Sequence, residues 1–120
     1  MPLNSKYLMI ASMDVEDEYE GIFNEVYERE HVPNLSRVPG VISIARFERQ
    51  ELTMRISGET RIVRIESEPK YTAIYELEGP EVLVSDAWAK AVEDGRWPAQ
   101  ARPHTKNRRH VLLKLLTPGR

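Results

Sequence analysis

The stretch Asn24–Arg46 decides the fold, because its sequence NEVYEREHVPNLSRVPGVISIAR holds the end of a helix, a turn and the start of a strand. Pro33 predicts that the helix ends at about residues 30–32, since proline lacks the N–H that a helix interior needs. The Pro-Gly pair at 39–40 predicts a turn. The apolar run that follows predicts a strand over Val41–Arg49.

The helix that leads into this stretch is expected to begin at Asp14. Asp14 is suited to the N-cap position, and the acidic residues after it favour the positive end of a helix dipole. Apolar side chains then recur at helical spacing, which predicts one buried stripe. The stripe consists of Val15, Tyr19, Ile22, Phe23, Val26 and Tyr27.

The rest of the chain alternates short apolar runs with one further helical pattern. Lys6–Met13 and Tyr71–Leu77 predict strands, and Glu81–Asp94 predicts a helix that Gly95 stops. The expected inner face of that helix is Val84, Trp88, Ala91 and Val92. An irregular segment over Arg96–Asn107 is expected to precede a last strand over His110–Leu116.

The stretch 52–66 is predicted to form a hairpin arm. Two β-prone runs, Met54–Ser57 and Thr60–Ile65, flank Gly58 and Glu59. This hairpin would extend the second strand beyond the sheet. We assign residues 1–120 to a single domain, because 120 residues is within the usual length of one domain. The hairpin is expected to belong to this domain.

The predicted order of strand, helix, strand, strand, helix, strand is the ferredoxin-like βαββαβ arrangement. It is an α+β fold in which both helices cover one face of a four-stranded antiparallel sheet. The first and last strands carry apolar residues on both faces, with Leu8 and Ile10 opposite Met9 and Ala11. A second copy packed on the uncovered face would form a sheet-to-sheet homodimer.

Composition excludes several classes of function. Apolar residues make up 41% and charged residues 30%, which is typical of a globular protein. The net charge of -2 argues against a nucleic-acid partner, and no segment has the length and apolarity of a membrane span. The absence of cysteine removes disulfides and thiolate chemistry and is compatible with a cytoplasmic location.

The stretch that opened this section also resembles a known superfamily. The residues that carry the resemblance are Asn24, Glu25, Tyr27, Glu30, His31, Pro33, Leu35, Pro39 and Gly40, with Arg46 on the following strand. They are similar to a pattern of the dimeric α+β barrel proteins. This superfamily includes EthD-like proteins, antibiotic-biosynthesis monooxygenases, muconolactone isomerases and stress-responsive barrel proteins. The resemblance implies a homodimer whose ligand cavity lies between the first helix and the sheet.

His31 and Tyr27 are the candidate catalytic residues, because their i, i+4 spacing would place an imidazole and a phenol on one flank of the helix. The alternative is that His31 caps the end of its helix. Asn24 and Arg46 are candidate polar anchors for a substrate, although an ion pair of Glu30 with Arg46 or Arg37 is the preferred structural role.

Three further features have alternative explanations. Tyr75 and Trp88 are candidate substrate contacts, although a place in the core is the preferred role. Trp97 is expected at the dimer interface. The basic segment from Arg96 to His110 could bind an anion or contact the acidic first helix of a second copy.

No motif indicates a metal or a cofactor, since the three histidines are far apart and no glycine-rich phosphate loop occurs. Two hypotheses remain. One is a small cofactor-free enzyme, of isomerase, monooxygenase or degradation-accessory type, acting on an apolar or aromatic oxygenated compound. The other is a non-catalytic ligand-binding or stress-related dimer without an accessible active site.

Overall fold

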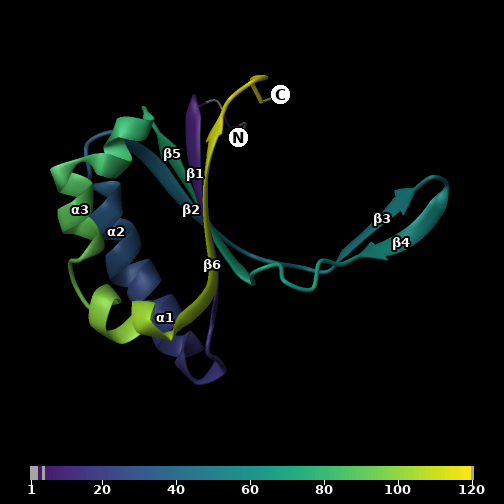
Figure 1. The fold of residues 1–120 in the computed structure, drawn as a ribbon, viewed down its shortest axis with the longest axis horizontal. Helices are drawn as coiled ribbons and strands as arrows, with labels where there is room; N and C mark the ends of the chain where they lie inside the picture. The colour runs from purple at the N-terminus through teal and green to yellow at the C-terminus, as the bar shows by residue number, and fades with distance from the viewer. Residues whose placement is uncertain (1–2, 4, 120) are drawn as a thin grey trace.

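The computed structural model describes Leu3 and residues 5–119, and its centre is a four-stranded antiparallel sheet of order β2-β5-β1-β6. The helices cover one face of this sheet, and a hairpin projects away on the other side (Figure 1). The predicted ferredoxin-like α+β fold is confirmed. The four sheet strands are β1 (Tyr7–Val15), β2 (Val41–Glu48), β5 (Tyr71–Leu77) and β6 (Thr105–Lys114).

The first helical stretch begins later than the sequence predicts. β1 continues through Val15, so Asp14 is a strand residue whose Oδ1 accepts a hydrogen bond from the Lys70 N–H at 2.9 Å. A short 3-10 turn, η1 (Asp17–Tyr19), then leads into α1 (Glu20–Val26). Asp14 therefore secures the start of β5 and does not cap the helix.

The same helical stretch also ends later than predicted. After α1 the chain widens into a π-helical turn, η2 (Tyr27–His31), and continues as α2 (Val32–Ser36). Pro33 falls in the first turn of α2, where a missing N–H is tolerated. Pro33 thus begins a new α-helical segment where the sequence predicts an end.

The hairpin arm is confirmed. β3 (Leu52–Ile56) pairs with β4 (Glu59–Val63) through a two-residue turn. Ser57 and Gly58 both have positive φ, at 53° and 79°, which is the backbone that suits the right-handed twist of a hairpin. Leu52, Met54 and Ile56 alternate along one face of β3 and are exposed.

The second helical pattern divides into two pieces. A 3-10 segment, η3 (Pro80–Val84), precedes α3 (Asp86–Val92), whose N-cap Ser85 accepts a hydrogen bond from the Trp88 N–H at 3.1 Å. Trp88, Ala91 and Val92 pack against the core as predicted. Val84 does not, because it lies in the 3-10 segment outside the helical register and is 86% exposed.

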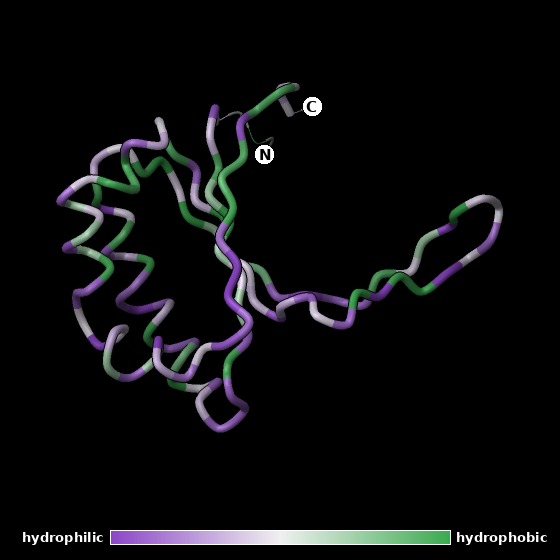
Figure 2. The backbone as a smooth tube through the Cα atoms, viewed as in Figure 1, coloured by the Kyte–Doolittle hydropathy of each residue, from purple (hydrophilic) through white to green (hydrophobic). Residues whose placement is uncertain are grey.

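The segment expected to be irregular contains defined structure. It forms a π-helical turn, η4 (Trp97–Ala101), a 3-10 turn, η5 (Arg102–His104), and the first residues of β6. β6 begins five residues earlier than predicted, because Lys106 pairs with Asp14 of β1. Figure 2 shows this strand changing from hydrophilic near its start to hydrophobic near its end.

The core lies between the helices and the sheet. Met9, Ala11 and Met13 of β1 are buried there, with Phe23, Tyr27 and Leu35 from the helical stretch above them. The opposite face of the sheet carries Leu8 and Ile10 beside Val111 and Leu113 of β6. Val111 and Leu113 are about half exposed in the single chain.

Candidate functional site

His31 lies on the inner side of the helical stretch, at the end of the π-helical turn. It is 5% exposed, its ring is stacked on that of Trp97, and the edge of Tyr27 meets it at a centroid distance of 5.0 Å. Because the helix continues to Ser36, His31 is not at a helix end. The predicted alternative, a helix-capping histidine, is therefore wrong.

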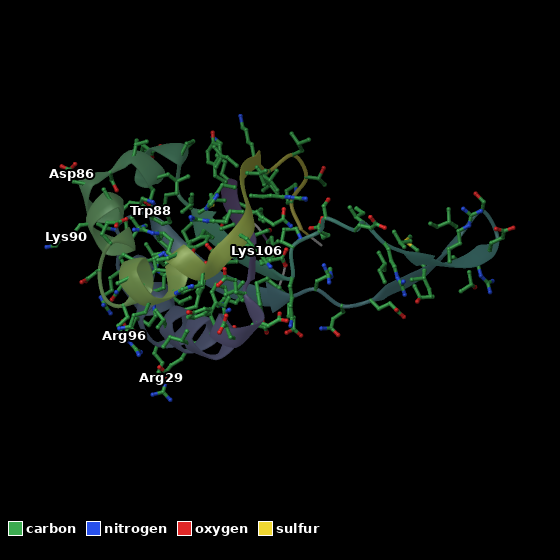
Figure 3. The ribbon with its side chains drawn as sticks, turned by 60° about the horizontal axis from the view of Figure 1, so that its bottom comes forward. Arg29, Asp86, Trp88, Lys90, Arg96 and Lys106 are labelled. Atoms are coloured by element: carbon green, nitrogen blue, oxygen red, sulfur yellow. The ribbon has the colours of Figure 1, made fainter. Side chains whose placement is uncertain are left out.

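A cavity of about 310 Å³ adjoins His31 between the helical layer and the sheet. Four of the predicted site residues line it: Tyr27, His31, Tyr75 and Trp88. In Figure 3 Asp86 and Lys90 of α3 point outwards, whereas Trp88 on the same helix reaches the sheet, with its ring 5.6 Å from that of Tyr75. The other lining residues are Met9, Ala11, Met13, Leu35, Leu83, Val92, Trp97, Arg102, Arg108 and His110.

The surroundings of His31 favour its neutral form. Burial, and then the positive charges of Arg102 and Arg108, lower the pKa of His31 from 6.5 to about 4. Its Nδ1 is enclosed and has no hydrogen-bond partner among the described residues. A neutral imidazole in this position can donate or accept one hydrogen bond, according to its tautomer.

Tyr27 is joined to Tyr75 across the cavity floor. Their hydroxyl oxygens are 3.0 Å apart, and either group can be the donor. Burial raises the pKa of both phenols, so both remain protonated at neutral pH. The pair links η2 to β5 and holds both rings at the cavity wall.

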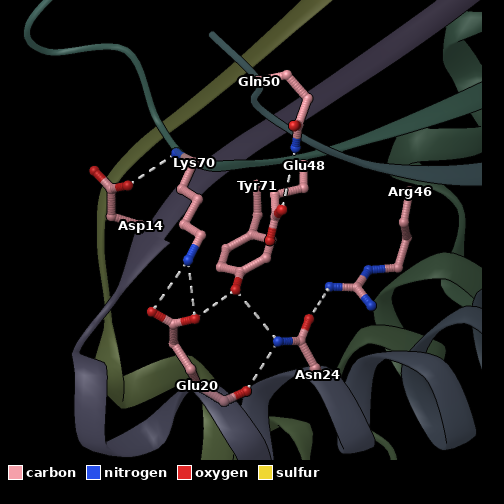
Figure 4. Close-up of polar contacts among 8 residues, drawn as sticks. All are labelled: Asp14, Glu20, Asn24, Arg46, Glu48, Gln50, Lys70 and Tyr71. Atoms are coloured by element: carbon pink, nitrogen blue, oxygen red, sulfur yellow. Dashed lines mark hydrogen bonds and ion pairs between the residues drawn. The ribbon is translucent and has the colours of Figure 1, made fainter.

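Asn24 and Arg46 do not line this cavity. The Arg46 guanidinium lies over the Tyr27 ring, 4.5 Å from its centroid, and donates to Asn24 Oδ1 at 2.7 Å and Glu28 Oε1 at 3.1 Å. Figure 4 shows the Asn24 amide between Arg46 and the Tyr71 hydroxyl. These residues connect α1 to the sheet and keep Tyr27 in place.

The predicted ion pair of Glu30 with Arg46 or Arg37 is wrong, because Glu30 pairs with Arg96. Its carboxylate accepts hydrogen bonds from the Arg96 backbone N–H at 2.8 Å and from Arg96 Nε, and this pairing lowers the pKa of Glu30. Arg37 instead donates to Asn34. Arg96 comes into reach because η4 folds back against α1, which no local sequence pattern indicates.

The basic segment contributes residues to the cavity that the sequence analysis did not assign to it. Arg102, Arg108 and His110 line the cavity, and Trp97 is buried beside His31 and not placed at a surface for a second copy. Part of this segment does meet the acidic first helix, but within one chain, through Arg96 to Glu25. The sequence signal for these cavity residues is the basic composition of residues 96–110. The spacing of the basic residues does not indicate which of them face the helices.

The described residues contain no cluster of three or more histidine or acidic side chains that could hold a metal ion. His104 stacks on Tyr19 and contacts Glu16, and it shares neither of these partners with His31. Within the same part of the chain, no helix is long and apolar enough to cross a membrane.

Comparison with known proteins identifies the fold. No family pattern and no curated protein matches the sequence. Among solved structures, an EthD family protein from Bacillus halodurans has a TM-score of 0.55 and 14% identity, over 92% of this chain and 99% of that one. SnoaB, a cofactor-independent oxygenase from Streptomyces nogalater, has a TM-score of 0.55 and 14% identity, over 94% and 95%.

A third similar structure is MhuD, a heme-degrader from Mycobacterium tuberculosis, solved with two hemes bound in its active site. It has a TM-score of 0.56 and 14% identity, over 92% of this chain and 96% of that one. The predicted likeness to EthD-like α+β barrel proteins is thus confirmed at the level of fold.

Proposed function

We propose that this protein binds a small aromatic, oxygenated compound in the cavity beside His31, where Tyr27 and His31 orient the compound and handle its protons. The observation that supports this proposal is the cavity itself. It is lined by a buried neutral imidazole together with aromatic rings and methionines. Its volume of about 310 Å³ is at the lower end of the range for small-molecule sites. A flat ring system therefore suits it better than a bulky one.

The similar structures support a small-molecule site. SnoaB is named as an oxygenase and MhuD as a heme-degrader, so this fold accommodates chemistry on small molecules in at least two proteins. Tyr75 and Trp88 would contact the ring of the ligand from the sheet and from α3. Tyr75 and Trp88 thus keep the role of substrate contacts. Asn24 and Arg46, in contrast, act by positioning Tyr27 and not by contacting the ligand.

The chemistry available to His31 depends on the ligand. With a pKa of about 4, His31 is a weak base in the empty cavity. The equilibrium constant for proton transfer from a phenol of pKa about 10 to His31 would be unfavourable by a factor of about 10⁶. A negative charge beside the imidazole raises its pKa and reduces this factor. Proton transfer therefore requires a ligand that is, or becomes, an anion.

The lowered pKa of His31 also favours one alternative, a ligand-binding protein without catalysis. A neutral His31 can hold a hydroxyl or carbonyl group by one hydrogen bond without taking its proton. Turnover distinguishes the alternatives: the absorbance spectrum of a bound hydroxynaphthoquinone changes with time in an enzyme and stays constant in a binding protein. In the enzyme, His31→Gln abolishes the change while retaining binding.

Tryptophan fluorescence tests the site directly, because the two tryptophans of the chain, Trp88 and Trp97, both line the cavity. Titration with 1-naphthol should change their emission saturably. Val92→Phe, on the cavity side of α3, should weaken this binding by filling space. Ala89→Phe, on the exposed side of the same helix, is the matched control. Equal binding by both variants would refute the cavity as the site.

We further propose that the protein is a homodimer that uses the uncovered sheet face. Val111 and Leu113 are exposed there, and the arm leaves the sheet on that same side (Figure 1). A two-stranded hairpin with an exposed apolar face has little stability alone, so a second copy that covers both surfaces is the favoured occupant. A cytoplasmic location, consistent with a cysteine-free chain, belongs to the same proposal.

Sedimentation velocity checks the dimer. Val111→Glu should raise its dissociation constant by at least about tenfold, because it buries a charge in the interface. Val84→Glu, a more exposed valine on the helical side, should leave the dissociation constant unchanged. A monomeric wild-type protein, or equal effects of both substitutions, would contradict the proposal.

A further inference from the structure

The charges around the cavity do not cancel. Two guanidinium groups line it, those of Arg102 and Arg108. Arg102 is neutralised, since its two terminal nitrogens donate to the two carboxylate oxygens of Glu93 at 2.7 and 2.8 Å. Such a bidentate pair occupies the donors of Arg102 and compensates its formal charge with that of Glu93.

Arg108 has no such partner. Among Leu3 and residues 5–119, no carboxylate forms an ion pair or hydrogen bond with its guanidinium. Its positive charge nevertheless contributes to the lowered pKa of His31 and of His110, and it partly opposes the rise that burial causes in the pKa of Tyr27. The charge of Arg108 therefore acts on the cavity from β6.

Strand geometry explains why Arg108 and not its neighbour has this role. His110 pairs with the buried Ala11, and His110 and Arg108 both line the cavity, so both lie on the face of β6 that looks towards the helices. Arg109 pairs with Ser12 and points to the opposite face. There its guanidinium donates to the Ser67 carbonyl at 2.8 Å and pairs with Glu68 at 3.5 Å.

The two imidazoles of the cavity add no positive charge at neutral pH. Burial and Arg108 lower the pKa of His110, as burial and the two arginines lower that of His31. The lining groups therefore sum to one uncompensated positive charge, at Arg108. A planar guanidinium of this kind matches a carboxylate or an enolate oxygen pair.

We infer that the cavity selects a monoanionic ligand, an aromatic compound with one carboxylate or enolate group, and that Arg108 is the residue that provides this specificity. The inference rests on the proposed small-molecule site and adds the charge of its ligand. The ring lies among the methionines and aromatic rings, and the anionic group faces β6 at Arg108. Bound there, the anion also raises the pKa of His31.

A matched pair of probes tests this assignment. 1-Naphthoate and 1-naphthamide have nearly the same shape and differ in charge. Their binding is measured by tryptophan fluorescence in wild type, Arg108→Gln and Arg109→Gln. Wild type should bind naphthoate at least about tenfold more tightly than naphthamide, as expected for one hydrogen-bonded charge.

Arg108→Gln should lose this preference while its naphthamide affinity stays unchanged, and Arg109→Gln should behave as wild type. A preference that survives in Arg108→Gln, or is absent in wild type while naphthamide still binds, overturns the inference and leaves the proposed site intact. Binding of neither probe overturns both. NMR titration of His31 gives a second readout, because its pKa should rise with naphthoate and remain low with naphthamide.

Discussion

The imidazole of His31 lies parallel to the indole of Trp97, with ring centroids 4.2 Å apart and an interplanar angle of 18°. This stack covers one face of the imidazole, and the Tyr27 ring meets its edge. Aromatic rings, and not hydrogen bonds, therefore hold the side chain in place. Such surroundings accommodate a neutral imidazole far better than a charged one.

Acid should destabilise the protein through His31. Its pKa is about 4 in the folded chain against an ordinary 6.5, so between these values the unfolded chain binds a proton that the folded chain does not. The free energy of unfolding should fall as the pH drops from 6.5 to 4, by up to about 3 kcal/mol. Urea denaturation at several pH values measures this. His31→Gln should show a shallower dependence, and identical slopes would contradict the prediction.

The Tyr27–Tyr75 hydroxyl pair should show energetic coupling. Each single Tyr→Phe substitution leaves the other buried hydroxyl without its partner and should cost about 1 kcal/mol. The double substitution removes both hydroxyls, so it should cost less than the sum of the two singles. Urea denaturation of the four proteins gives the coupling free energy. A value of zero would mean that the 3.0 Å contact contributes nothing.

The contact between Glu30 and Arg96 should stabilise the docking of η4 on the first helical stretch. Glu30→Gln should lower the thermal midpoint at pH 7 more than Glu25→Gln, because Glu30 accepts two hydrogen bonds from Arg96 and Glu25 accepts one. The pKa of Glu30 is lowered from 4.5, so this stabilisation exists above that pH and is lost as the pH falls through the folded pKa. Below the folded pKa of Glu30, the midpoints of wild type and Glu30→Gln should converge.

Two glycines should respond to alanine in opposite directions. Gly40 has a φ of +94°, and a Cβ there would lie 2.4 Å from Val82 Cγ2, so Gly40→Ala should cost about 1–3 kcal/mol. Gly21 is exposed in α1 with nothing near its Cβ position, so Gly21→Ala should gain about 0.5–1 kcal/mol. Thermal unfolding measures both. Val82→Ala should rescue only part of the Gly40→Ala loss, because the backbone strain remains.

Much of the fold could be predicted because it depends on local patterns. The strand Tyr71–Leu77 and the arm were found from alternation and turn residues. The limits of the first helical stretch were wrong, because Asp14 and Pro33 obey tertiary requirements: one secures β5, and the other follows a widened turn. Local rules cannot anticipate either requirement.

The candidate site could be predicted only in part. Tyr27 and His31 were found because they share one side of a helix, and Tyr75 and Trp88 because aromatic residues line cores. Arg108 was missed as a cavity residue because its face depends on how β6 pairs with β1, which is a long-range register. Sequence periodicity alone carries no information about that register.

The π-helical turn at Tyr27–His31 has a consequence for comparing this chain with others. A π turn accommodates one residue more than an α-helical turn over the same rise. A related chain that lacks one residue here would form an uninterrupted α-helix, and its residues on either side would still superpose. An alignment that places no gap within 27–31 would therefore match His31 with the wrong position in such a chain, shifted by one step around the helix axis.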